Sequence, residues 1–177
     1  MRIRRFGIIA VVLWLAAAAS CAPAGDVAAE SVQASGDDAL ATPVVREILA
    51  RTTNPPGAPG HDLTLVRYTI APGAELAPHV HPGVQLAAIE SGTLSYRVIS
   101  GTATIHRGVD AAGEPASVEQ VAGPADTELG AGDVVVEPAE LHHFGANRTA
   151  APVIILATLI TEAGADLAVA EALPAAE

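Results

Sequence analysis

The sequence predicts a single all-β domain, either a sandwich or a barrel. The chain has 177 residues, which corresponds to about one domain. From residue 43 onward, short runs rich in Val, Leu, Ile and Thr follow one another, and Gly or Pro stands in nearly every gap. Only residues 162–173 have a composition that favours a helix. Many short strands separated by turn residues are typical of sandwiches and barrels, and not of βαβ units.

Nine segments carry the strand signal. They are, in chain order, Val44–Thr52, Leu63–Ile70, Val84–Glu90, Thr93–Ser100, Thr102–Arg107, Ser117–Val121, Val134–Glu137, Leu141–Ala146 and Val153–Thr161. Asn54–Gly57 is a strong breaker between the first two, and residues 108–116 are typical of a hairpin tip. Since alternate residues of a strand share a face, we expect Val134 and Val136 to pack together in the core.

Composition and charge exclude several function classes. Only 3% of the residues are aromatic, so aliphatic side chains must build the core. Nine basic residues, all of them Arg, stand against twenty acidic ones. An acidic chain does not have the basic surface that binding nucleic acid or docking on anionic lipid requires. The single Cys, Cys21, excludes an intrachain disulfide and a cysteine-based zinc site.

The first 21 residues have the pattern of an export signal. Three Arg and no acid in Met1–Arg5 precede the fourteen uncharged, mostly apolar residues 6–19. This run is shorter than the about 20 residues that span a bilayer, and it suits a secretory signal. Small residues directly before Cys21 resemble a bacterial lipobox, which implies lipidation of Cys21. Ordinary cleavage after Ala24 is the alternative; we favour the lipoprotein because the only Cys ends the apolar run.

The chain therefore divides into four parts. We expect a signal peptide over residues 1–21, a flexible tether over 22–42, the folded domain over 43–163 and a tail over 164–177. The tether is rich in Ala, Gly, Ser and acids, without periodicity. The expected location is the cell envelope as a lipoprotein, or otherwise the periplasm or the extracellular space.

Two of the six histidines stand two residues apart in Pro78-His79-Val80-His81-Pro82. On a strand both side chains point to the same face, so both imidazoles can meet one metal ion. Gln85 follows four residues later and can return to that face after a turn at Pro82-Gly83. A third ligand must come from elsewhere in the fold. His142 is expected on the surface.

Two segments resemble the paired motifs of the cupin superfamily, in its single-domain, type-2-like form. Residues 73–92 match the first motif, in which Gly, His-x-His, Glu and Gly follow at set intervals. Residues 132–147 match the second motif, in which Gly, Pro-x-Gly, His and Asn follow. The resemblance covers about residues 44–161. It implies a double-stranded β-helix, or jelly-roll barrel, and a homodimer is plausible from the resemblance alone.

Carried over position by position, the resemblance implies that His79, His81 and His143 are metal ligands. The chain departs from the family at Gln85, where the motif has Glu, and at Glu140, where it has Gly. Gln85 is either a weak oxygen ligand or a group that hydrogen-bonds a ligand. The alternatives are two polar histidines at a barrel mouth, with His143 as a core histidine. Catalytic residues are not assigned.

The expected cofactor is one divalent transition metal (Fe, Mn, Zn, Cu or Ni), since a nitrogen-rich site disfavours Mg and Ca. Three protein ligands with open positions are typical of a catalytic metal. One hypothesis is an exported, dioxygenase-like metal-dependent oxidoreductase for a small enol, phenol or diketone. The other is a non-catalytic cell-surface module that captures a small ligand or a metal.

We expect one member of each pair Arg67/Tyr68 and Tyr96/Arg97 to face the barrel. Contact with a membrane is expected through the lipid anchor only.

Overall fold

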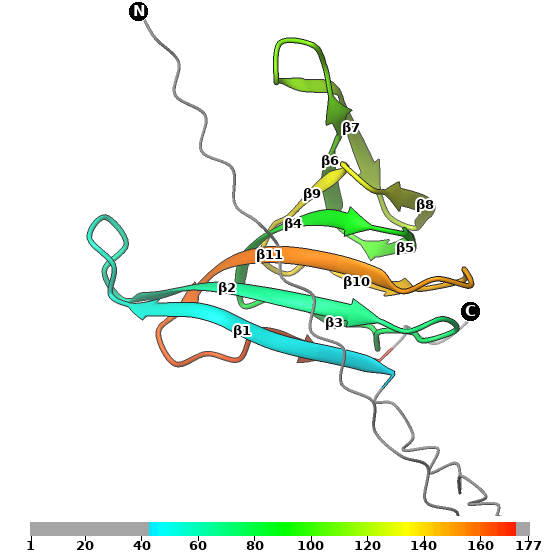
Figure 1. Ribbon diagram of the computed structural model, residues 1–177. Coiled ribbons are helices and arrows are strands. Elements are labelled where there is room, and N and C mark those ends of the chain that lie inside the picture. Colours follow the sequence, from blue (N-terminus) through cyan, green and yellow to red (C-terminus); the bar gives the residue numbers. More distant parts are fainter. Residues whose placement is uncertain (1–42, 173–177) are drawn as a thin grey trace, which may run out of the picture. The chain divides into compact units, whose positions relative to one another are not determined.

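The computed structural model describes residues 43–172, which form two antiparallel β-sheets (Figure 1). One sheet has seven strands in the order β1-β2-β11-β4-β9-β6-β7, and the other has five in the order β12-β3-β10-β5-β8. The all-β jelly-roll expectation is confirmed. The signal peptide, Cys21 and the tether lie outside the described residues. Within residues 43–172 no helix has the length and apolar character needed to cross a membrane.

All nine expected strands are present, with bounds that differ by at most two residues. The twelve strands are β1 (Val44–Thr53), β2 (His61–Ile70), β3 (His79–Val80), β4 (Gly83–Ser91), β5 (Thr93–Ser100), β6 (Thr102–Val109), β7 (Pro115–Ala122), β8 (Ala125–Gly130), β9 (Val134–Glu137), β10 (His142–Ala146), β11 (Val153–Glu162) and β12 (Val169–Ala170). The expected hairpin tip joins β6 to β7, but it is shorter than the predicted range 108–116, since Val109 already pairs with Pro115.

Three of the twelve strands are not among the nine ranges: the short β3, which carries His79 on a strand as expected, and β8 and β12, which lack a sequence signal. Strand β8 contains Asp126, Thr127 and Glu128, and acidic residues are depleted in strands; pairing with β5 nevertheless holds it in the sheet. The helix-friendly segment 162–173 forms no helix over its described residues, because tertiary contacts decide its conformation. Leu167 is buried, and β12 pairs with β3.

Aliphatic side chains from both sheets build the core, as the low aromatic content requires. The largest fully buried apolar side chains are Ile70, Ile105, Leu129, Leu141, Leu159, Val66, Val98, Val135 and Val153. Burial of such side chains is the dominant favourable term in folding. Among residues 43–172, Tyr96 is the only Phe, Tyr or Trp in the buried core, at 3% exposure.

The expected orientation of strand β9 is wrong. Val135 and Glu137 face the interior at 1% and 2% exposure, whereas Val134 and Val136 are half-buried on the other face. Three consecutive valines give no alternation from which the inward face can be predicted. The consequence for the site is direct, because the inward face of β9 ends in a carboxylate.

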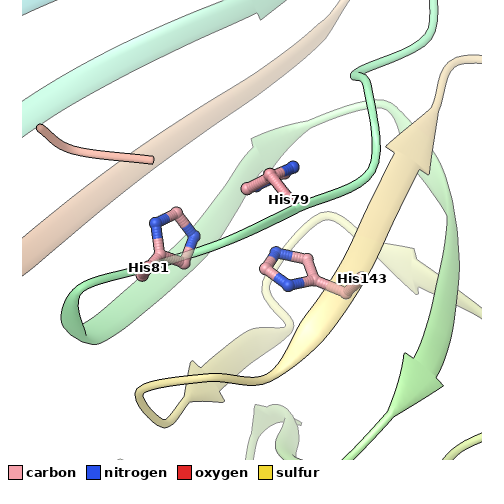
Figure 2. A group of neighbouring side chains, drawn as sticks. All are labelled: His79, His81 and His143. Carbon is pink, nitrogen blue, oxygen red and sulfur yellow. The ribbon is translucent and has the colours of Figure 1, made fainter. Parts of the chain in front are cut away.

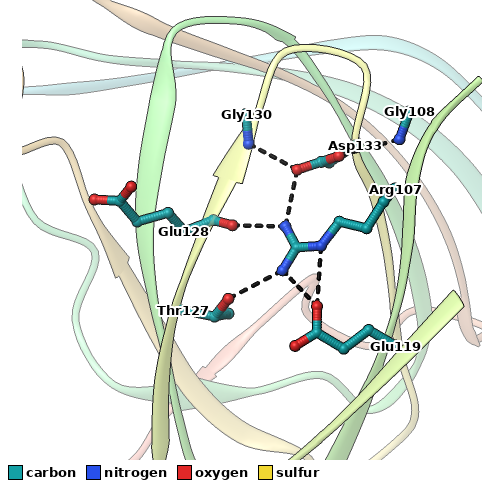
Figure 3. Close-up of polar contacts among 7 residues, drawn as sticks. All are labelled: Arg107, Gly108, Glu119, Thr127, Glu128, Gly130 and Asp133. Atoms are coloured by element: carbon teal, nitrogen blue, oxygen red, sulfur yellow. Dashed lines mark hydrogen bonds and ion pairs between the residues drawn. The ribbon is translucent and has the colours of Figure 1, made fainter. Parts of the chain in front are cut away.

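A cluster of polar contacts around Arg107 joins strands of the two sheets (Figure 3). All five N–H bonds of its guanidinium have acceptors: the Glu119 carboxylate, the Asp133 carboxylate, the Glu128 carbonyl oxygen and the Thr127 hydroxyl. Asp133 also accepts from the backbone N–H groups of Gly108 and Gly130. These contacts fix β6 and β7 of the seven-stranded sheet to β8 of the five-stranded sheet.

Candidate metal centre

Strand pairing brings His79, His81 and His143 together (Figure 2). His79 on β3 lies directly opposite His143 on β10, and their ring centroids are 4.4 Å apart. His81 follows β3, with its ring centroid 5.1 Å from that of His79 and 5.3 Å from that of His143. One nitrogen from each ring lies within 4.8 Å of the other two. The three residues predicted to bind one ion are therefore placed to do so.

The chain turns sharply after His81 because Gly83 allows a close backbone approach. A Cβ at residue 83 would collide with the backbone carbonyl oxygen of Ile160 on β11. A glycine is therefore required where the chain leaves the five-stranded sheet and begins β4 in the seven-stranded sheet. This turn holds His81 at the corner between the sheets.

The hydrogen bonds of the three histidines leave their Nε2 atoms available. His79 Nδ1 lies 2.7 Å from the Ala77 carbonyl oxygen, His81 Nδ1 lies 2.6 Å from that of Leu167, and His143 Nδ1 lies 2.9 Å from that of Leu141. A carbonyl oxygen only accepts, so each Nδ1 must carry the hydrogen. Each neutral ring therefore presents an Nε2 lone pair, the form in which imidazole binds a metal.

Glu137 is a buried carboxylate in the same place. Its Oε1 lies 3.3 Å from His143 Nε2, and its Oε2 lies 3.3 Å from His81 Nε2. The Tyr96 hydroxyl donates to Oε1 at 2.8 Å, and Gln85 Nε2 donates to Oε2 at 2.5 Å. Glu137 is only 2% exposed, and a buried charge must be compensated by partners of this kind.

The titration of these groups reflects the buried carboxylate. Burial acts to raise the pKa of Glu137, but His143 and then His81 outweigh it and hold that pKa below its usual range. Burial acts to lower the pKa of His143, but the Glu137 charge outweighs it and raises that pKa. Burial, and then the charge of His143, lowers the pKa of His79 to about 4. Burial and Glu137 together raise the pKa of Tyr96.

The three histidines and Glu137 line a cavity of about 250 Å³. Its other walls are largely apolar and come from both sheets, from residues that include Leu76, Ile89, Leu94, Leu129 and Ile155. Arg46 on β1 and Tyr68 on β2 also line it, and they are register partners. Ala168 and Ala170 contribute a wall from the segment expected to be a tail. The cavity suits a small, mostly apolar molecule with a polar end.

Other sequence expectations have mixed outcomes. Tyr68 and Tyr96 face the cavity, while Arg67 pairs with Glu90 and Arg97 with Asp126 at the exposed surface; one member of each pair faces inward, as expected. Gln85 is buried and hydrogen-bonds Glu137.

His142 is not on the surface as expected. It is only 7% exposed. A register shift lies between His142 and His143, and only His143 belongs to the histidine cluster. His61 is exposed, and neither it nor His106 belongs to the histidine cluster.

Sequence reasoning missed Glu137 and Arg46. A signal for Glu137 existed: it precedes Pro138 within the second motif and ends an apolar strand. Its significance depended on the orientation of β9 and on the register that places it opposite Gln85. Nothing in the sequence around Arg46 distinguishes it from other surface arginines, because only the fold brings β1 to the cavity.

Comparison with known proteins agrees with the fold. Residues 34–175 match the family model described as Cupin. Among solved structures, a cupin-like protein from Thermotoga maritima is 19% identical, with a TM-score of 0.47, over 72% of this chain and 75% of that chain. A cupin superfamily protein from Desulfitobacterium hafniense is 14% identical, with a TM-score of 0.45, over 67% and 78%.

A conserved Klebsiella pneumoniae protein with a double-stranded β-helix domain is 25% identical, with a TM-score of 0.43, over 75% of this chain and 88% of that chain. No curated protein matches the chain. The family model covers well over half of the sequence, including both motifs and all the described strands. The chain belongs to the cupin family.

Proposed function

We propose that this protein is an exported cupin that binds one divalent transition metal through His79, His81 and His143 and acts as a dioxygenase-like oxidoreductase on a small molecule. The observation that carries the proposal is that three histidines each place one ring nitrogen within 4.8 Å of the other two, at a largely apolar cavity. Three nitrogen ligands leave coordination positions for a substrate, as in catalytic metal sites. Such a metal supplies Lewis acidity and, if redox-active, the means to react with oxygen.

The residues of the cavity favour a small anionic or ionisable substrate. Arg46 contributes a permanent positive charge to a wall that is otherwise largely apolar. It has no ion-pair partner among the described residues. Burial raises the pKa of Tyr68, so its hydroxyl keeps its hydrogen and can donate to an enolate, phenolate or carboxylate oxygen. The apolar walls would contact the rest of the molecule.

A non-catalytic binding module is the second candidate. The observation that favours it is that most polar side chains of the cavity are already hydrogen-bonded to one another or to the backbone. Tyr96 and Gln85 both donate to Glu137, and each histidine donates to a backbone carbonyl. No acid and base pair separate from this network lines the cavity among the described residues. A module of this kind would hold a metal or a small anion without converting it.

Metal content is the first test. Untagged protein should contain about one transition metal per chain, the stoichiometry of a single such site, and His79→Ala/His81→Ala should contain none. His61→Ala/His106→Ala is the matched control, since it removes two histidines that lie outside the cluster. Absence of metal after reconstitution would contradict the metal site.

Turnover separates the two candidates. The metal-loaded protein is incubated under oxygen with a panel of small enols, phenols and diketones, and oxygen uptake is followed together with substrate loss. Consumption that disappears in His143→Ala would support the oxidoreductase. Saturable binding of the same compounds without consumption would instead support the binding module.

Export and lipidation are part of the proposal and rest on residues 1–42 alone. Labelling with a radioactive fatty acid in a bacterial host should mark the wild-type chain and not Cys21→Ser. An unlabelled, exported chain that begins after Ala24 would favour ordinary signal cleavage.

A homodimer also belongs to the proposal. Val84 and Leu86 on β4 and Ile160 on β11 are 43–47% exposed on adjacent strands. Light scattering of the wild type and of Leu86→Asp measures whether this surface joins two copies.

A further inference from the structure

We infer that Glu137 is the fourth ligand of the metal, so that the carboxylate expected at position 85 is supplied from the neighbouring strand instead. This inference rests on the proposed three-histidine site and adds a ligand to it. The first support is position. Glu137 on β9 lies directly opposite Gln85 on β4. Opposite residues of an antiparallel pair project from the same face, with Cβ atoms about 5 Å apart.

The second support is the spacing of the donor atoms. Glu137 Oε1 and His143 Nε2 are 3.3 Å apart, and so are Glu137 Oε2 and His81 Nε2. Two ligands with bonds of about 2.1 Å to one ion lie about 3.0 Å apart at a right angle and about 3.4 Å apart at a tetrahedral angle. Both observed separations fall within this range. The carboxylate is therefore as close to the nitrogens of His81 and His143 as a ligand of the same ion would be.

The third support is the direction of the hydrogen bonds. His81 and His143 donate from Nδ1 to backbone carbonyl oxygens, so in the neutral rings their Nε2 lone pairs face Glu137. A lone pair and a carboxylate oxygen repel each other unless a proton or a metal ion lies between them. His81 Nε2 is buried and has no hydrogen-bond partner among the described residues. A metal ion bound to both groups would remove this repulsion.

Gln85 and Tyr96 then act as positioning residues. Gln85 Nε2 donates to one carboxylate oxygen and the Tyr96 hydroxyl to the other. The reversed amide of Gln85 would place its carbonyl oxygen against the carboxylate, which is unfavourable. Two hydrogen bonds from opposite sides hold the Glu137 carboxylate in one orientation and leave its remaining lone pairs for the metal.

The register suggests an exchange experiment with three variants. Glu137→Gln removes the carboxylate, Gln85→Glu adds one at the family's usual position, and Gln85→Glu/Glu137→Gln exchanges the two side chains without changing composition or charge. Glu128→Gln is the matched control, because it removes one carboxylate from an exposed position on β8. Isothermal titration with Zn²⁺ gives the affinity, and the visible absorption of the Co²⁺ complex reports the ligand set.

We expect Glu137→Gln to bind Zn²⁺ at least about 100-fold more weakly than the wild type and to change the absorption bands of the Co²⁺ complex. Loss of a residue that only hydrogen-bonds a ligand typically lowers metal affinity by at most about 100-fold. The exchanged variant should recover the affinity to within about tenfold of the wild type and restore the bands. Glu128→Gln should match the wild type. Circular dichroism establishes that each variant is folded. If Glu137→Gln does not fold, the exchanged variant Gln85→Glu/Glu137→Gln tests the inference instead, because it keeps one carboxylate and one amide at positions 85 and 137.

Three results would overturn the inference. They are unchanged affinity in Glu137→Gln, weaker affinity with unchanged Co²⁺ bands, and a folded exchanged variant that recovers neither property. Failure of the wild type itself to bind metal would overturn the proposed function instead. If metal binding is lost in His143→Ala but kept in Glu137→Gln, the three-histidine site is supported and only the assignment of Glu137 as fourth ligand is wrong.

Discussion

The protein contains two clusters that stabilise carboxylates, and they do so by different means. In the first, Asp133 and Glu119 are paired with Arg107, whose charge is permanent (Figure 3). In the cavity, Glu137 is surrounded by Gln85, Tyr96 and two histidines, none of which carries a permanent charge. The Arg107 cluster is complete within the chain. The Glu137 cluster needs a proton or a metal ion to become neutral.

Burial explains why this difference matters. The Arg107 side chain is 26% exposed and that of Glu119 is 47% exposed, so water shares in their solvation and the cost of assembling them is small. The side chains of Glu137, His81 and His143 are each 3% exposed. A buried ion group without full compensation costs several kcal/mol. In the cavity a proton or a metal ion would reduce this cost, whereas the Arg107 cluster carries its own cation.

The largest expected effect is stabilisation by metal. At a free metal concentration of about 1,000 times Kd, binding to the folded state alone raises the free energy of unfolding by about 4 kcal/mol. Urea unfolding with metal and with a chelator measures the gain. Arg107→Met should show the full gain, and His143→Ala should show none. An equal gain in His143→Ala would indicate that the metal binds elsewhere.

The next effect is a pH dependence confined to the cavity. In metal-free protein the pKa of His79 is lowered from 6.5 to about 4, so the unfolded chain binds this proton at higher pH than the folded chain does. The free energy of unfolding should therefore fall as the pH falls from 6.5 towards 4, by at most about 3 kcal/mol.

Two variants check this pH dependence. Urea unfolding across the window should show a smaller slope in His79→Gln, which cannot take up the proton. Arg107→Met should keep the wild-type slope, because Arg107 is charged at every pH used. An unchanged slope in His79→Gln would contradict the assignment to His79.

Removal of the Arg107 guanidinium should lower the free energy of unfolding moderately, by an amount that does not depend on metal. Arg107→Met abolishes five hydrogen bonds, but Asp133 keeps its two backbone donors. We expect a loss of about 2 kcal/mol in the free energy of unfolding, the same with metal and with chelator. Arg107→Lys should recover only part of it, since an ammonium group cannot reproduce the planar set of donors. A loss that depended on metal would mean that the two clusters are coupled.

The smallest effect concerns the turns that lead into the clusters. Glu140 has a φ of 67°, in the left-handed region, whereas the corresponding turn near Asp133 has Gly132 at 92°. Glu140→Gly should relieve the strain of a left-handed non-glycine residue. Glycine also increases the entropy of the unfolded chain, which opposes this gain, so we expect a net stabilisation of only about 0.5 kcal/mol. Thermal unfolding measures the change, and Gly132→Ala, expected to destabilise, is the opposite control.

Much of the fold and half of the site could be predicted because the signals are local. The nine strands follow from β-branched and aliphatic runs between Gly and Pro. His79 and His81 share a face because a strand alternates with period two. Assignment of His143 needed the spacing of the second motif, including Asn147, which is fully buried and donates to the Ile70 and Ala151 carbonyl oxygens.

Other features depended on partners that are distant in the sequence. Strand β8 forms because β5 offers an edge to it, despite its acidic composition. The segment that contains Leu167 packs against the site and accepts the His81 hydrogen bond across 86 residues of sequence. Local composition favours a helix there, but a short isolated helix gains little stability without packing.

By itself, the sequence determined the all-β cupin fold and the three histidines, because both depend on local alternation and on motif spacing. Only the tertiary structure decided where the carboxylate comes from. Gln85 looks like the loss of an acidic ligand, and Glu137 looks like the polar end of a valine strand. The antiparallel register of β4 and β9 places the two opposite each other. Register is set by the packing of whole strands, and no residue within either strand specifies it alone.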